Sequence, residues 1–151
     1  GSGSMQIHSD LSLVHPPPWN EPWAINIIWV LNDMKEENGA TRYLPYSHKI
    51  SQPSDLPKEI NKEIHPIEAE AGSIIAMDGR LWHTSGANIT QNEERGLLFA
   101  FYTRSFIRPQ WNFSAGLSDK TKSSLPDKLR YRLGLELAAN TYAGYSNHTE
   151  K

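Results

Sequence analysis

A histidine and an aspartate stand two residues apart near the start of the chain, in the tripeptide His8-Ser9-Asp10. On a β-strand this spacing directs both side chains to the same face. One imidazole and one carboxylate supply two ligands of the 2-His-1-carboxylate triad, which suits Fe(II) because it leaves coordination positions open. A polar strand end is the alternative interpretation, because His-x-Asp is a common tripeptide. The metal hypothesis therefore requires a second histidine from a distant part of the chain.

His83 is the best candidate for that second histidine. It follows a strand-like run, a glycine turn and a short apolar segment within residues 72–82, so a rigid element would carry its imidazole into a cavity. His15, His65 and His148 lie in a proline-rich loop, a charged stretch and the last few residues. A core histidine bonded to a backbone carbonyl is the alternative for His83.

Arg95 stands twelve residues after His83, at the head of an apolar run over residues 97–102. A guanidinium that begins a buried strand requires an anionic partner, and its planar fork matches a carboxylate. That carboxylate belongs either to a bound ligand or to one of the 17 acidic residues of the chain. The sequence leaves both alternatives open.

Strand-like runs separated by turn signals must position these side chains. They are rich in Ile, Trp, Tyr, Phe and Thr, and they cover residues 5–10, 24–31, 41–44, 73–77 and 96–106. Apolar residues occupy both faces of the run 24–31, which predicts a strand that is buried on both sides. This pattern favours a β-sandwich or a filled barrel.

Helix signals are confined to two places. One short candidate covers residues 56–64. In the other, Ser124 and Asp127 have the spacing of a capping box, Pro126 falls in the first turn, and Gly134 supplies the stop. The sequence therefore predicts a mainly β fold with a C-terminal helix.

The composition excludes several classes of protein. The 15 Lys and Arg against 17 Asp and Glu give a formal charge of −2, which leaves no broad cationic surface for nucleic acid or anionic lipid. The absence of cysteine excludes a disulfide framework, a thiolate metal site and a cysteine nucleophile. The longest apolar run, over residues 24–31, is too short to cross a bilayer, and we expect a cytoplasmic protein. Residues 1–4 look like a cloning scar, so we expect residues 5–151 to form one domain.

Several longer motifs follow one another along the chain. They are His8-Ser9-Asp10, Trp29-Val30-Leu31-Asn32-Asp33, Asn38-Gly39-Ala40-Thr41 with Pro45-Tyr46-Ser47-His48, Asp78-Gly79-Arg80-Leu81-Trp82-His83, and Tyr102-Thr103-Arg104 with Arg108-Pro109-Gln110. In order and spacing they closely resemble the phytanoyl-CoA dioxygenase family of Fe(II)- and 2-oxoglutarate-dependent oxygenases. The resemblance runs from Gln6 to Tyr145.

This resemblance implies a fold and a set of site residues. The family has a double-stranded β-helix fold, a cupin-like jelly-roll, which agrees with the mainly β pattern. The resemblance implies His8, Asp10 and His83 as iron ligands. It also implies that Arg95 holds the far carboxylate of 2-oxoglutarate and that the hydroxyl of Ser85 helps Arg95 to do so. Gln6, Thr41 and Trp29 match positions where relatives line the cosubstrate.

The implied activity is that of a dioxygenase that uses Fe(II), 2-oxoglutarate and O₂, hydroxylates a small organic substrate, and releases succinate and CO₂. Relatives that halogenate carry a small residue in place of Asp10, so this carboxylate argues for hydroxylation. Two alternatives remain open. One is a non-catalytic jelly-roll module for binding or assembly, and the other is a cupin-like metal protein that uses the same ligands without 2-oxoglutarate.

The position of the first motif differs from the family pattern. Relatives have a substantial N-terminal portion ahead of His-x-Asp, whereas His8 stands four residues after the apparent scar. We therefore expect an N-terminally truncated catalytic core. A sandwich that lacks a core strand exposes a sheet edge and an apolar face, which predicts a homodimer or a higher oligomer formed through that edge.

Overall fold

A computed structural model describes residues 3–15, 17 and 20–135. The chain forms two compact units, Gly1–Tyr102 and Thr103–Lys151. The expectation that residues 5–151 form one domain stays a prediction. No helix within the described residues is long and apolar enough to cross a membrane.

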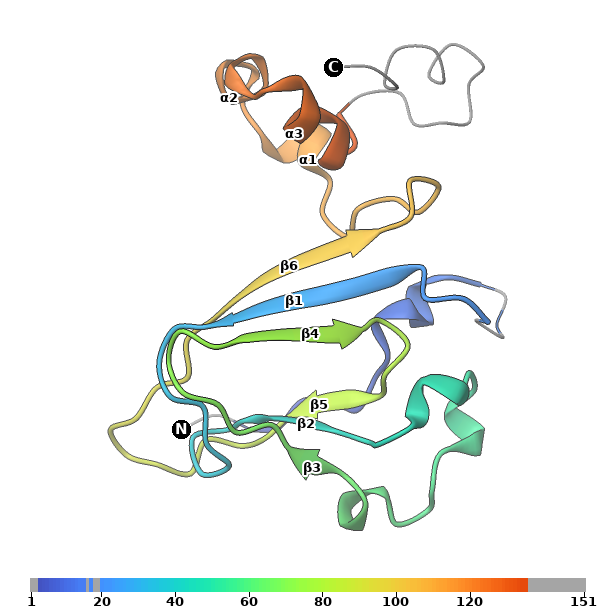
Figure 1. The fold of residues 1–151 in the computed structure, drawn as a ribbon, viewed down its shortest axis with the longest axis vertical. Coiled ribbons are helices and arrows are strands. Elements are labelled where there is room, and N and C mark those ends of the chain that lie inside the picture. The colour runs from blue at the N-terminus through green and yellow to red at the C-terminus, as the bar shows by residue number, and fades with distance from the viewer. Residues whose placement is uncertain (1–2, 16, 18–19, 136–151) are drawn as a thin grey trace. The chain divides into compact units, whose positions relative to one another are not determined.

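The first unit contains two three-stranded sheets (Figure 1). One has the order β4-β1-β6 and consists of β4 (Ile74–Asp78), β1 (Ala24–Val30) and β6 (Leu97–Thr103). The other has the order β3-β2-β5 and consists of β3 (His65–Pro66), β2 (Thr41–Tyr43) and β5 (His83–Ser85). Strand β1 pairs antiparallel with β4, and β2 pairs antiparallel with both β3 and β5.

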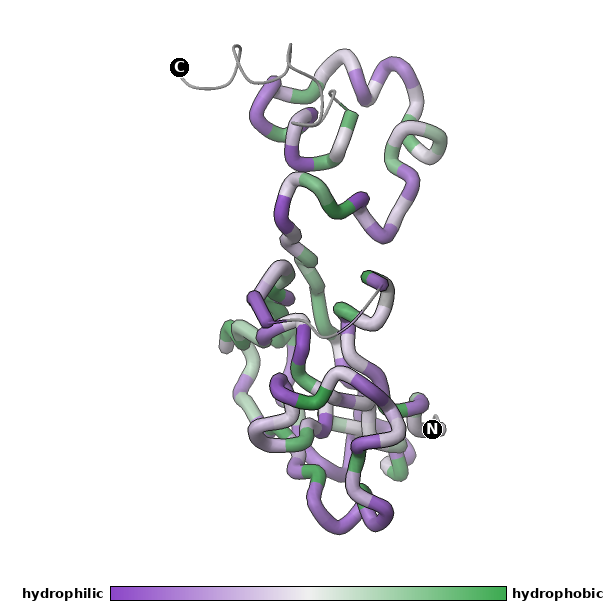
Figure 2. Tube along the Cα trace, turned by 90° about the vertical axis from the view of Figure 1, so that its right-hand side faces the viewer, coloured by the Kyte–Doolittle hydropathy of each residue, from purple (hydrophilic) through white to green (hydrophobic). Residues whose placement is uncertain are grey.

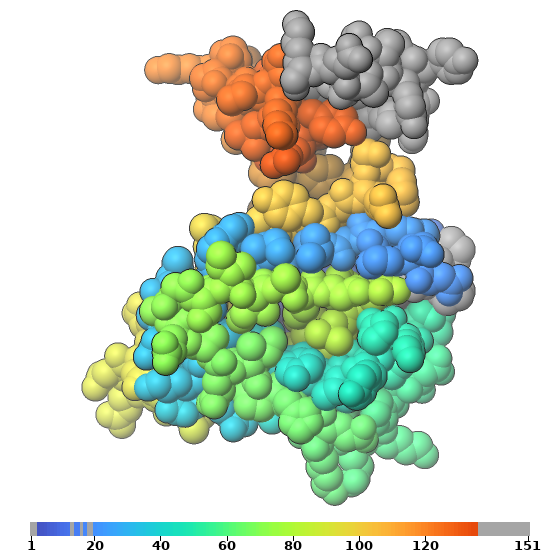
Figure 3. All heavy atoms as spheres, viewed as in Figure 1, coloured from blue at the N-terminus to red at the C-terminus, as the bar shows by residue number. Residues whose placement is uncertain are grey.

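One face of β1 forms part of the core. Ala24, Asn26, Ile28 and Val30 are buried on this face. Ile25, on the other face, is 41% exposed, and Ile74, which pairs with Trp29, is 63% exposed. Strands β1 and β4 are open to view in the space-filling picture (Figure 3). The prediction of a strand buried on both sides is therefore wrong, because this second apolar face of the described chain borders solvent.

A cluster behind the second sheet holds β2 and β5 in place. Leu44, Ile64 and Trp82 form its buried centre, and Ile7 packs against them. The Trp82 backbone N–H donates to the Ser47 hydroxyl, at 2.9 Å. Since side chains alternate along a strand, anchoring Leu44 and Trp82 on this side turns their neighbours Tyr43 and His83 to the opposite face.

The predicted helix over residues 56–64 is absent from the described structure. The 3-10 turn Pro53–Asp55 ends just before this range, and within it the structure has only the 3-10 turn Ile60–Lys62. Ile64 belongs to the buried centre of the Leu44 and Trp82 cluster, and Leu56 and Ile60 pack against it, which explains their helix-like spacing. Pro57 lies inside this segment, where it would interrupt helical hydrogen bonding.

The predicted strand over residues 5–10 is also wrong in detail. His8 forms an isolated antiparallel bridge with His83, and a 3-10 helix begins at Asp10 (Asp10–Leu13). The strand ladder ends because the Ser12 N–H donates to the Ser9 carbonyl, at 3.0 Å, which turns the chain. The predicted strand over 96–106 is confirmed as β6 but ends at Thr103. Most residues of strand β6 are hydrophobic (Figure 2).

The second unit contains three short helices, α1 (Phe113–Gly116), α2 (Asp119–Ser124) and α3 (Asp127–Arg132). Asn112 caps α1, and Ser118 caps α2. Ser124 ends α2 and does not cap α3, so the predicted capping box is wrong, although Gly134 does follow α3 with a φ of 69°. Tyr145, at the end of the family resemblance, lies outside the described residues.

Candidate metal centre

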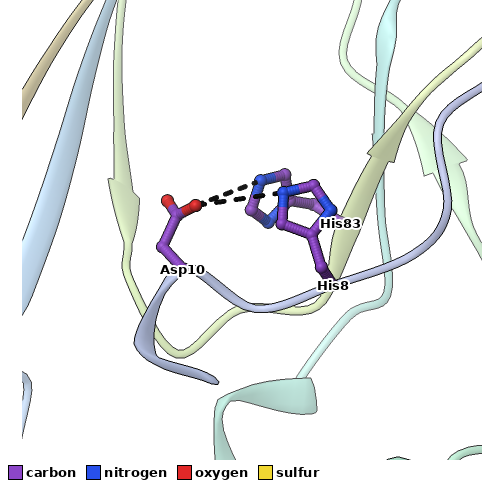
Figure 4. A group of neighbouring side chains, drawn as sticks. All are labelled: His8, Asp10 and His83. Carbon is purple, nitrogen blue, oxygen red and sulfur yellow. Dashed lines mark ion pairs between the residues drawn. The ribbon is translucent and has the colours of Figure 1, made fainter. Parts of the chain in front are cut away.

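His8, Asp10 and His83 meet at one place in the first unit (Figure 4). Their three potential ligand atoms lie within 4.8 Å of one another. The Asp10 Oδ1 atom is 3.8 Å from His83 Nε2 and 4.0 Å from His8 Nε2. These distances are too long for hydrogen bonds, but one ion can bind all three atoms. The structure therefore brings together the three residues that the sequence singled out, and their role as metal ligands stays a prediction.

Backbone pairing holds the two histidines side by side. The His8 N–H donates to the His83 carbonyl at 2.9 Å, and the His83 N–H donates to the His8 carbonyl at 2.8 Å. The ring centroids are 4.4 Å apart. Both imidazoles therefore project from the same face of one short pairing.

The tautomer of each histidine follows from its hydrogen bond. His8 Nδ1 lies 2.9 Å from the Gln6 carbonyl, and His83 Nδ1 lies 2.9 Å from the Leu81 carbonyl. A carbonyl only accepts, so both Nδ1 atoms carry the hydrogen, and each neutral ring keeps its lone pair on Nε2. Metal-binding histidines are oriented in this way by their other ring nitrogen.

Burial favours the neutral, ligand-competent form of His83. The residue is 8% exposed, and this burial lowers the pKa of its imidazole below 6.5 despite the opposing effects of the Leu81 carbonyl and Asp10. A metal ligand must be free of its proton. His83 therefore meets this requirement at neutral pH.

Asn26 orients the carboxylate. Its side-chain N–H donates to Asp10 Oδ2 at 3.2 Å, which leaves Oδ1 directed to the two histidines. Asn26 is 8% exposed, and its own Oδ1 is buried with no hydrogen-bond partner in the described structure. No motif of the sequence predicted this contact. The sequence signal for it is a polar amide among Ala24, Ile28 and Val30 on one face of β1.

Arg95 contacts β2, the strand that pairs with the strand carrying His83. Its Nη1 donates to the Thr41 hydroxyl at 3.3 Å. Burial lowers the pKa of Arg95 below 12.5, yet the guanidinium remains charged at neutral pH. No carboxylate of the described residues pairs with it, so the alternative of a structural ion pair is not found there.

The strand register relates Arg95 to the metal cluster. Thr41 pairs with Ser85, and Tyr43 pairs with His83. Two residues along a strand span roughly 7 Å. The Thr41 position, where Arg95 makes its contact, therefore lies roughly 7 Å along the sheet from the Tyr43–His83 pair. A short dicarboxylate can span this distance.

The remaining predicted site residues differ in their placement. Ser85 is half-buried opposite Thr41, but its hydroxyl makes no hydrogen bond to Arg95. Gln6 has an exposed side chain and contributes its carbonyl to His8. Trp29 lies on the face of β1 opposite to Asn26, and its cosubstrate-lining role stays a prediction. The motif match alone does not show which face of β1 Trp29 occupies.

The donor set fits ferrous iron. Two imidazole nitrogens and one carboxylate oxygen form the facial triad typical of non-haem Fe(II) oxygenases. The uncommitted acceptor of Asn26 adds a polar atom beside this set. Residues 1–96 also match the model of the phytanoyl-CoA dioxygenase (PhyH) family. The chain belongs to this family.

Curated relatives of this PhyH-family chain include proteins named as dioxygenases. The chain is 45% identical over 145 residues to "Dioxygenase af480" of Aspergillus fumigatus, which covers 96% of this chain and 45% of the relative. It is 33% identical over 112 residues to "Dioxygenase FUM3" of Gibberella moniliformis, which covers 73% of this chain and 35% of the relative. The chain thus spans less than half the length of these relatives.

Solved structures show the same fold. The non-heme alpha-ketoglutarate-dependent epimerase SnoN matches with a TM-score of 0.55 and 24% identity, over 69% of this chain and 41% of SnoN. EctD from S. alaskensis with bound Fe matches with a TM-score of 0.55 and 23% identity, over 74% of this chain and 42% of EctD. The predicted jelly-roll fold is therefore confirmed for the PhyH-family chain.

Proposed function

We propose that this chain carries the iron centre of an Fe(II)- and 2-oxoglutarate-dependent dioxygenase that hydroxylates a small organic substrate. The convergence of His8 Nε2, His83 Nε2 and Asp10 Oδ1 carries this proposal. Ferrous iron bound there would supply O₂ activation and C–H oxidation, with 2-oxoglutarate as the co-reductant that leaves as succinate and CO₂. A carboxylate ligand at Asp10, in place of a small residue, supports hydroxylation over halogenation.

Arg95 supports 2-oxoglutarate as the cosubstrate. It is a half-buried cation without a carboxylate partner in the described structure, and a buried cation is stabilised by an anion. In this proposal its guanidinium binds the far carboxylate of 2-oxoglutarate, and Thr41 holds the guanidinium in place. In this proposal Ser85, which pairs with Thr41 on the neighbouring strand, lies beside the bound 2-oxoglutarate.

The decisive experiment adds Fe(II) and then 2-oxoglutarate to the metal-free protein under anaerobic conditions. We expect the weak visible absorption that 2-oxoglutarate produces when it chelates ferrous iron. Arg95→Ala should bind Fe(II) but lose this absorption. Arg42→Ala is the matched control, since Arg42 is also half-buried but pairs with Glu36 at 3.6 Å, and it should keep the absorption.

The outcomes separate the competing functions. Iron binding without any response to 2-oxoglutarate would favour a cupin-like metal protein. A folded protein that binds no iron would favour a non-catalytic module for binding or assembly.

A further inference from the structure

Asp10 is attached to the site differently from the two histidines. His8 and His83 are fixed by reciprocal backbone hydrogen bonds. Asp10 lies beyond that pairing, at the first residue of the 3-10 helix Asp10–Leu13. Another set of contacts must therefore hold the carboxylate in register with the imidazoles.

One backbone atom, the Gly79 carbonyl oxygen, anchors the chain on both sides of Asp10. It accepts a hydrogen bond from the Ser9 hydroxyl at 2.9 Å and another from the Leu11 N–H at 2.9 Å. Ser9 and Leu11 are each 1% exposed. The residues before and after the ligand are thus fixed to the same point.

Gly79 is itself held close to β1. Its N–H donates to the Ala24 carbonyl at 2.9 Å, and a Cβ built on Gly79 would lie 2.8 Å from the Ala24 Cβ. The Leu81 N–H donates to the Asp78 carbonyl at 2.9 Å, which closes a turn around Gly79. Strand β5 begins at His83, two residues after Leu81, so the same turn sets the positions of Asp10 and His83.

Asn26 completes the arrangement from β1. The Gly79 anchor fixes the Asp10 backbone but leaves the carboxylate free to rotate. The hydrogen bond from Asn26 to Oδ2 restricts that rotation and directs Oδ1 to the histidines. Backbone position and carboxylate orientation are therefore controlled by two separate residues.

We propose that Ser9 and Asn26 are positioning residues of the metal centre, Ser9 through the Gly79 carbonyl and Asn26 through Asp10 Oδ2. The inference rests on the proposed iron centre and deepens it. Neither side chain binds the ion. Together they make Asp10 a ligand through Oδ1, with a geometry set before the ion arrives.

The test measures Co(II) binding to the full chain by the visible absorption of the bound ion. We expect Ser9→Ala and Asn26→Leu each to weaken the Co(II) affinity by about 10- to 100-fold. We also expect the absorption spectrum of both variants to shift toward that of Asp10→Ala, because the carboxylate no longer meets the ion. A change in the spectrum reports ligand geometry, which a general loss of stability would not alter.

Two controls separate positioning from folding. Ser12→Ala removes a neighbouring hydroxyl that donates to the Ser9 carbonyl and not to Gly79. Asn38→Ala removes a buried amide that bonds Lys35 and Asp33, and it should lower the melting temperature. Both should keep the wild-type Co(II) affinity and spectrum at temperatures below melting.

Each outcome has one meaning. Wild-type affinity and spectrum in both Ser9→Ala and Asn26→Leu would overturn the positioning role while the metal centre stands. A weakening no greater than that of Asn38→Ala, with an unchanged spectrum, would overturn it as well. If one variant fails to fold, the other decides. Failure of the wild-type protein to bind Co(II) or Fe(II) would overturn the metal centre itself, and the positioning role with it.

Discussion

The backbones of His8 and His83 exchange two hydrogen bonds, of 2.9 and 2.8 Å, although 75 residues separate them in the chain. Each imidazole also donates from Nδ1 to a carbonyl two residues earlier in its own segment, that of Gln6 or Leu81. The same type of local hydrogen bond thus sets the tautomer of both histidines. Two extended segments with equivalent local geometry present a matched pair of nitrogen ligands.

Removal of one histidine should abolish metal binding without unfolding the protein. In His83→Ala we expect the loss of Fe(II) and Co(II) binding, because only two of the three donors remain. His65→Ala is the matched control, since His65 lies on β3 of the same sheet and is exposed. Isothermal titration with Co(II) distinguishes the two. Equal loss in both variants would contradict the ligand assignment.

The hydroxyl of Thr41 should contribute to cosubstrate binding through Arg95. Thr41→Val keeps the shape but removes the acceptor of the Arg95 hydrogen bond. A hydrogen bond contributes about 1 kcal/mol, so we expect 2-oxoglutarate to bind roughly five-fold more weakly. The anaerobic 2-oxoglutarate titration of the iron-loaded protein measures this. An unchanged dissociation constant would show that Thr41 does not orient Arg95.

The sequence predicted which side chains meet better than the elements that carry them. Residue chemistry identified His8, Asp10 and His83, and the structure brings them together. The structural reason given for the pairing of His8 and Asp10 was only partly right, because Asp10 begins a 3-10 helix instead of sharing a strand with His8. That turn depends on the distant Gly79 carbonyl, which no local pattern around Asp10 reveals.

Other errors have a similar physical origin. Leu56, Ile60 and Ile64 share one apolar cluster, yet they reach it without a helix, from a segment that contains Pro57 and the 3-10 turn Ile60–Lys62. The face of β1 that Trp29 occupies could not be predicted from the motif, because one step along a strand reverses the face of a side chain. Asn26 was visible as a polar residue in an apolar strand, and only its contact with Asp10 gives it a role.

Strand β6 should mediate self-association. It is an edge strand in the order β4-β1-β6, and Leu98 and Phe99 on it are more than half exposed. Unpaired apolar edges favour pairing between chains. We expect light scattering at micromolar concentration to give the mass of a dimer or larger species, and Leu98→Lys to reduce it. A strictly monomeric wild-type protein would contradict this prediction.

Gly79 should tolerate no side chain. In Gly79→Ala the new methyl group would meet the Ala24 Cβ at 2.8 Å, and we expect a loss of about 1–3 kcal/mol in the free energy of unfolding. Gly116→Ala is the control, because nothing lies within 4 Å of its position, and alanine in helix α1 should be neutral or stabilising. Urea denaturation compares them. Equal stability of both variants would mean that the turn shifts to admit the methyl group.

The ion pair before His83 should make stability depend on acid pH. Burial alone would raise the pKa of Asp78, but Arg80, whose Nη2 lies 2.7 Å from Oδ2, holds that pKa below its ordinary value of 3.8. The unfolded chain therefore takes up this proton first as the pH falls below 3.8, so the stabilisation is complete above that pH and is lost below it. Asp78→Asn should be less stable at pH 7, by about 1–3 kcal/mol, and should lose less stability between pH 4 and pH 2. Urea denaturation of both proteins across this range provides the measurement, and parallel curves for the two would show that Asp78 is not the titrating group.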